Sequence, residues 1–156
     1  QGAAIGGGFG LAIAADFRVA CPEARFAANF TKLGIHPGFG LTHTLPRLIG
    51  QQKASFMFYT ARRINGETAL EMGLVDILTT KENLRNEAMA LAAEIAECAP
   101  LAILSTRATM RQGLAEAVKA QTDLEFIEQN KLFKTLDHKE GVLSVSERRP
   151  GNFIGQ

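Results

Sequence analysis

Residues Gly2 to Ala20 read Gly-Ala-Ala-Ile-Gly-Gly-Gly-Phe-Gly-Leu-Ala-Ile-Ala-Ala-Asp-Phe-Arg-Val-Ala, a glycine-rich turn followed by small apolar residues. The run from Leu11 to Ala15 is typical of a helix that is buried on most sides. The three glycines Gly6 to Gly8 let the backbone approach another group closely and leave N–H groups unpaired at the positive end of this helix. Such a turn suits an anion or a developing oxyanion, and it equally suits tight helix–strand packing.

Two nucleotide-binding interpretations fail on this turn. The stretch from Gly6 to Leu11 lacks the Gly-Lys-Ser/Thr of a phosphate-binding loop. Neither Gly6-x-Gly8 nor Gly8-x-Gly10 is followed by the third glycine of a dinucleotide-binding fingerprint. The turn therefore predicts neither kind of nucleotide site.

The composition is that of an ordinary globular chain. Its 156 residues are 46% hydrophobic and 21% charged, which argues against disorder and fibrous repeats. The formal net charge of +1 gives no excess that would favour nucleic acid or an anionic membrane. No apolar run reaches the roughly 20 residues that span a bilayer. Two distant cysteines, Cys21 and Cys98, favour a reducing, cytoplasmic compartment over a disulfide framework or a zinc site.

The hydrophobic pattern predicts an α/β chain with remnants of a sheet near its amino end and helices beyond them. Asn65 is placed to cap a helix, and Pro100 suits a first helical turn. Asp16 and Arg18 are predicted to form a structural pair. Strands are expected near residues 17–20, 25–28 and 75–78, and helices over 41–48, 51–59, 66–73, 82–98, 100–113, 114–132 (with Ala117, Val118, Leu124 and Ile127 inward) and 137–147.

The stretch from Gly2 to Ala20 closely resembles the signature of the crotonase superfamily, also called the enoyl-CoA hydratase/isomerase family. Further blocks agree in order and spacing, so the resemblance covers essentially the whole chain: Phe26 to Gly38, Thr44 to Gly50, Ala61 to Val75 and Lys139 to Pro150. It implies the α/β crotonase-like ββα spiral fold. Residues 1–98 would be the carboxyl-terminal part of the spiral core, and residues 99–156 a helical trimerisation and CoA-covering region. Because family members are longer, we expect an amino-terminal portion before Gln1.

The resemblance implies an acyl-CoA thioester as substrate and a homotrimer or hexamer as the assembly. It implies no metal and no cofactor beyond the coenzyme A of the substrate. Gly7 would supply one of two oxyanion-hole N–H groups, and the missing portion would supply the other. Gly6 and Gly8 would shape the turn at the substrate.

Family hydratases use two glutamates to hold and activate water, and the matching positions here are Gly10 and Phe30. A third acid position, used by some isomerases and a dehalogenase, falls on Gly38. None of these residues can exchange a proton, so we expect hydration by a glutamate pair to be disfavoured. Phe30, Pro37 and Gly38 would instead contact the substrate.

His36 is a candidate base, since a neutral imidazole can accept a proton near pH 7. It equally suits packing of the loop ahead of Pro37. His43 is predicted on a helix surface or at a subunit contact, and no nearby carboxylate or thiolate completes a metal site with the two histidines. The family's CoA-binding lysine matches Arg148, which keeps the cation; a solvated helix end is the alternative.

Two classes of function follow from these expectations. The first is an enzyme of the enoyl-CoA hydratase/isomerase type, a lyase or isomerase with unusual acid–base residues. The second is a non-catalytic acyl-CoA-binding protein of crotonase fold, and a structural fragment that needs its other half is a third possibility. Four phenylalanines could line an acyl tunnel or belong to the core: Phe9, Phe30, Phe39 and Phe58.

Overall fold

The computed structural model describes all 156 residues, and its hydrophobic cluster lies entirely between Phe9 and Leu84. Strand β1 (Ala3–Ile5) leads through the glycine turn into helix α1 (Gly7–Ile13) and pairs in parallel with β3 (Arg25–Ala27). Strand β2 (Val19–Ala20) pairs in parallel with β4 (Ile77–Leu78). These short parallel pairs frame the amino end of the core, so the predicted α/β class is confirmed.

Three helices and a short turn close the core around these strands. They are the 3₁₀ helix η1 (Thr31–Leu33), α2 (Leu41–Ile49), α3 (Gln51–Thr60) and α4 (Gly66–Met72). Helix α2 buries Leu41, Leu45 and Ile49, whose four-residue spacing places them on one face. The side chain of Asn65 accepts a hydrogen bond of 2.9 Å from the Thr68 N–H, which confirms the predicted cap of α4.

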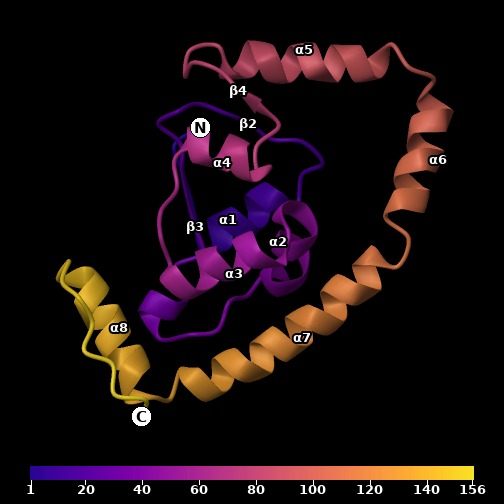
Figure 1. The fold of residues 1–156 in the computed structure, drawn as a ribbon. Coiled ribbons are helices and arrows are strands. Elements are labelled where there is room, and N and C mark those ends of the chain that lie inside the picture. The colour runs from indigo at the N-terminus through magenta and orange to yellow at the C-terminus, as the bar shows by residue number, and fades with distance from the viewer.

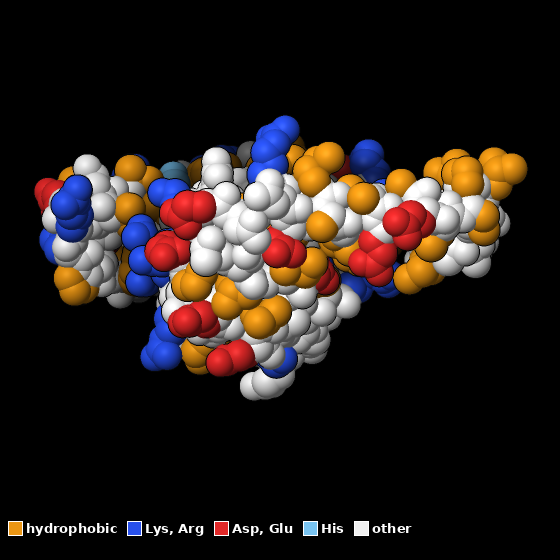
Figure 2. Space-filling view, turned by 90° about the horizontal axis from the view of Figure 1, so that it is seen from above, with side chains coloured by type: hydrophobic (Ala, Val, Ile, Leu, Met, Phe, Trp, Pro, Cys, Tyr) orange, Lys and Arg blue, Asp and Glu red, His pale blue; other side chains and the backbone are white.

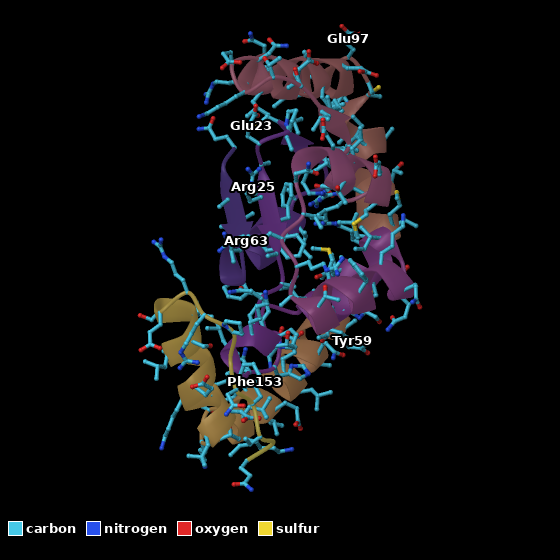
Figure 3. All side chains as sticks on the ribbon, turned by 60° about the vertical axis from the view of Figure 1, so that its left-hand side comes forward. Glu23, Arg25, Tyr59, Arg63, Glu97 and Phe153 are labelled. Atoms are coloured by element: carbon cyan, nitrogen blue, oxygen red, sulfur yellow. The ribbon has the colours of Figure 1, made fainter.

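The other four helices form an arc around this core (Figure 1): α5 (Leu84–Ala96), α6 (Pro100–Met110), α7 (Leu114–Leu132) and α8 (Leu136–Ser146). Figure 3 shows Glu97 beyond α5 at one end of the molecule and Phe153 beside α8 at the other. No single helix combines the length and apolar composition needed to cross a membrane. Helices α5 and α6 reach that threshold only as a pair, and they bend by 104° at their junction.

The arc leaves many of its apolar side chains in solvent. Leu101, Leu104 and Met110 of α6 are all exposed, and Figure 2 shows hydrophobic side chains at the surface among charged ones. On α7, Leu124 and Ile127 are also exposed, although the helical pattern predicts them inward. That prediction was wrong because α7 turns polar residues toward the core, as described below.

Two further expectations need correction. Helix α1 begins at Gly7, so two of the three glycines belong to the helix itself rather than to the turn before it. Asp16 and Arg18 do not pair with each other. The buried Arg18 side chain donates to the Leu74 carbonyl (2.6 Å) and lies 3.5 Å from the Asp76 carboxylate. Asp16 faces outward and pairs with two arginines of the arc instead.

Candidate functional site

The glycine turn holds two backbone donors that the chain leaves free. Gly6 adopts φ 55° and ψ −119°, a conformation that favours glycine, and its N–H donates to the Ala27 carbonyl (3.0 Å). The Gly6 carbonyl accepts from the N–H groups of Phe9 and Gly10. The N–H groups of Gly7 and Gly8 donate to no acceptor in the chain. The first turn of α1 therefore presents adjacent N–H groups to an external acceptor, as an oxyanion-binding turn requires.

Phe39 lies against this turn. A Cβ atom on Gly7 would lie 2.8 Å from Cε2 of Phe39, and a Cβ atom on Gly10 would lie 2.6 Å from its Cβ. Phe39 itself has φ 65°, a conformation that side-chain-bearing residues rarely adopt. Both glycines are thus required while Phe39 holds its place, and a larger side chain at position 10 would displace the ring.

Phe30 closes the other side of the turn. Its ring is buried, and its Cζ atom lies 4.0 Å from the position that a Cβ on Gly6 would occupy. The Oδ1 atom of Asn29 lies 3.3 Å from the same position. The structure therefore brings Gly6, Gly7, Gly10 and Phe30 together, and the ring of Phe30 gives this side of the turn an apolar wall.

The loop that follows η1 is held from the arc by side chains of α7. Gln129 donates to the His36 carbonyl (2.8 Å), and its Nε2 atom would meet a Cβ on Gly38 at 2.8 Å. Glu125, only 1% exposed, accepts from the Gly40 N–H (2.7 Å) and from the N–H (2.9 Å) and hydroxyl (2.6 Å) of Thr42. These bonds satisfy orphan donors at the start of α2 and set the position of the loop that carries Phe39.

The sequence contains a signal for these contacts that the apolar pattern concealed. Gln121, Glu125 and Gln129 recur every fourth residue and therefore share one face of α7. Gln121 donates to the Thr42 hydroxyl (2.8 Å), which extends the same polar contact. The face of α7 turned to the core is thus partly hydrogen-bonding rather than apolar.

The structure does not bring His36 into the group at the glycine turn. Its Nδ1 atom lies 2.8 Å from the Pro37 carbonyl oxygen, and its ring lines a cavity of about 370 Å³ together with Ser55 and Tyr59. Gly10 and Phe39 line a different cavity of about 760 Å³. His43 is half-buried, and its Nε2 atom is buried without a hydrogen-bond partner.

Arg148 and Arg149, which follow α8, differ in their interactions. Arg149 pairs with Glu140, and its Nη2 atom lies 3.0 Å from Oε2 of that carboxylate. Together with a hydrogen bond that the Asn152 N–H donates to Glu140, this ion pair lowers the pKa of Glu140 to about 2. Arg148 is exposed and makes no ion pair. A free cation therefore lies next to one that stabilises the carboxyl-terminal tail.

The chain is similar to known proteins along its whole length. The family model described as enoyl-CoA hydratase/isomerase matches residues 1–156. The chain is 37% identical over 156 residues to a crotonyl-CoA hydratase of Syntrophomonas wolfei, covering all of this chain and 60% of that protein. It is 33% identical over 149 residues to a short-chain-enoyl-CoA hydratase of Clostridium acetobutylicum, covering 96% of this chain and 57% of that protein.

Solved structures show the same fold. An enoyl-CoA hydratase/isomerase of Pseudoalteromonas atlantica superposes with a TM-score of 0.88 at 29% identity, over 98% of this chain and 62% of that one. A carnitinyl-CoA hydratase of Mycobacterium avium gives 0.91 at 27% identity, over 99% and 60% respectively. The chain thus spans about 60% of the length of these relatives. Matched along its whole length by the family model, the chain belongs to the enoyl-CoA hydratase/isomerase family.

Proposed function

We propose that the protein binds acyl-CoA thioesters and stabilises an enolate oxygen with the N–H of Gly7. The observation that carries this proposal is the pair of unpaired N–H groups at the first turn of α1. A thioester oxygen that gains negative charge needs such donors in a water-poor site, and each is worth about 3 kcal/mol in the transition state. The names of the relatives, which act on enoyl-CoA compounds, support the same substrate class.

The site does not favour hydration by a pair of glutamates. The residues at the three acid positions are Gly10, Phe30 and Gly38, and the apolar neighbours of the turn are the rings of Phe30 and of Phe39, which lies against Gly10. The geometry gives His36 no support as the base, because it lines another cavity. We therefore assign proton transfer to none of these four residues. The alternative is an acyl-CoA-binding protein without chemistry, favoured by the absence of a carboxylate at the turn.

Mass spectrometry of the whole natural protein separates these alternatives. A short 2-enoyl-CoA and a 3-enoyl-CoA are incubated with it in deuterated water. Added water, or deuterium at the α or γ carbon, shows an enzyme. Thioesters that bind unchanged show a binding protein, and the absence of both binding and turnover contradicts the proposed function.

We also propose that Arg148 binds a phosphate of CoA, since it is the free cation of the carboxyl-terminal pair. Arg148→Glu should weaken CoA binding about tenfold, because an attraction is replaced by a repulsion. Arg63 provides the matched control, because it is also exposed and lies on the β3 side of the core (Figure 3). Equal affinities for the wild type and Arg148→Glu would remove this role.

The assembly is proposed to be a homotrimer or hexamer in which residues 99–156 supply contacts. The exposed apolar side chains of α6 support this proposal, since surfaces of that kind mark protein contacts. Sedimentation of the wild type and of Leu104→Glu tests it, with dissociation of the variant as the expected result. An unchanged sedimentation coefficient removes this helix from the contact.

A further inference from the structure

The lining of the cavity beside Phe39 combines apolar and cationic side chains. It measures about 760 Å³, within the range of small-molecule sites, and residues of α1, α2 and α7 line it. Apolar side chains contributed by all three helices include Ile13, Leu48 and Val118. Gly10 also lines this cavity and lies three residues after Gly7 on the same face of α1, so the cavity adjoins the turn proposed to hold the thioester.

The cations of this cavity outnumber its carboxylates. Asp16 is the only acidic residue in its lining. The basic residues there are four: Arg18, Arg47, Arg111 and Lys119. Arg18 is occupied by Asp76 and by backbone carbonyls, and Lys119 by Asp123. The positive charges of the other two, Arg47 and Arg111, are not fully neutralised within the chain.

The first of these is Arg47, whose side chain makes no hydrogen bond or ion pair. Thr44 and Arg47 are three residues apart on α2, and both line the cavity. The face of α2 that carries these two residues is therefore turned toward the cavity. The second is Arg111, which lies 3.4 Å from the Asp16 carboxylate. Arg107 lies 2.9 Å from the same carboxylate. One carboxylate cannot neutralise two guanidinium groups, so this pair also leaves a positive charge.

We infer that the cavity receives the acyl end of the thioester and that the preferred acyl chain ends in a carboxylate. This inference rests on the proposed function. The apolar side chains contact the methylene groups of the chain, while Arg47 binds the terminal carboxylate with its planar fork and Arg111 adds a second cation. A chain with a methyl end would leave Arg47 without a partner and Arg111 with only the Asp16 carboxylate that it shares with Arg107.

A pair of thioesters of equal chain length tests the inference with the whole natural protein. Glutaryl-CoA and pentanoyl-CoA differ at the far end of the acyl chain, where one carries a carboxylate and the other a methyl group. Calorimetry should show glutaryl-CoA bound about tenfold more tightly, because charge-assisted hydrogen bonds are gained. The preference should shrink between about 0.05 M and about 0.5 M salt, because Arg47 is exposed and screened.

Variants locate the preference. Arg47→Gln should lower the affinity for glutaryl-CoA about fivefold to tenfold and leave that for pentanoyl-CoA unchanged. Arg63→Gln, an exposed arginine outside the cavity, should change neither affinity. Equal binding of the two thioesters, or a preference that Arg47→Gln leaves intact, overturns the inference while the proposed function stands. Failure to bind either thioester overturns the proposed function itself.

Discussion

The core and the arc of this protein are held by different forces. The core buries a continuous cluster of apolar side chains between Phe9 and Leu84, whereas no residue of that cluster lies beyond Leu84. The arc is attached by polar contacts such as Glu125 at the start of α2 and His138, whose Nδ1 atom lies 2.7 Å from the Leu33 carbonyl oxygen. Apolar burial thus holds the core together, while directed hydrogen bonds from the arc position the loop that carries Phe39.

The largest expected effect on the free energy of unfolding contrasts a buried leucine of the core with an exposed leucine of the arc. Leu45→Ala should lower the free energy of unfolding by about 2–5 kcal/mol, because Leu45 is fully buried and a cavity remains. Leu104→Ala on α6 makes the same chemical change at a side chain that is 62% exposed. Measured on the dissociated subunit, this change should cost no more than about 0.5 kcal/mol. Urea unfolding at fixed protein concentration measures both, and equal losses would erase the distinction.

A second prediction concerns the polar attachment of the arc. Glu125→Ala should cost about 3 kcal/mol, because it leaves the N–H groups of Gly40 and Thr42 buried without an acceptor. Glu128 on the same helix has only an ion pair with the exposed Lys131. Glu128→Ala should therefore cost no more than about 0.5 kcal/mol in the same unfolding experiment. Similar losses for the two variants would show that the buried carboxylate does not anchor the arc.

A third prediction tests the packing of Phe39 against the glycine turn within the core. Gly10→Ala should destabilise the protein by about 1–3 kcal/mol, since its Cβ overlaps Phe39. Gly8→Ala in the same helix meets no atom within 4 Å and should be neutral or stabilising by up to about 1 kcal/mol. Adding Phe39→Ala should recover part of the loss at Gly10. Thermal unfolding of the single and double variants measures this coupling, and additive losses would contradict it.

The smallest effect concerns the tail that closes the arc. Because Arg149 lowers the pKa of Glu140 to about 2, the folded arrangement is favoured above the carboxyl's ordinary pKa of about 4.3. That contribution is lost as the pH falls from about 4.3 to about 2. Hydrogen exchange at the Asn152 amide, corrected for intrinsic rates, should show less protection across this window. Glu140→Gln should abolish the dependence, and a dependence that persists would assign it to another group.

Local signals account for the elements that were predicted correctly. Asn65 caps α4 through a contact three residues away, and Pro100 begins α6, so neither depends on distant chain. The glycine turn was equally evident, because only adjacent glycines leave its backbone free of side chains. The same local pattern failed for α7, where Leu124 and Ile127 are exposed and Glu125 is buried.

The α/β class, the family, the order of the helices and the absence of carboxylates at Gly10, Phe30 and Gly38 all follow from the sequence alone. These properties depend on residue identity and on spacing along the chain. Three further features depend on contacts between distant segments: Phe39 lies against the turn, His36 lines another cavity, and Glu125 holds the start of α2. Such contacts join residues as far apart as 85 positions, and the periodicity of one segment carries no information about its distant partner.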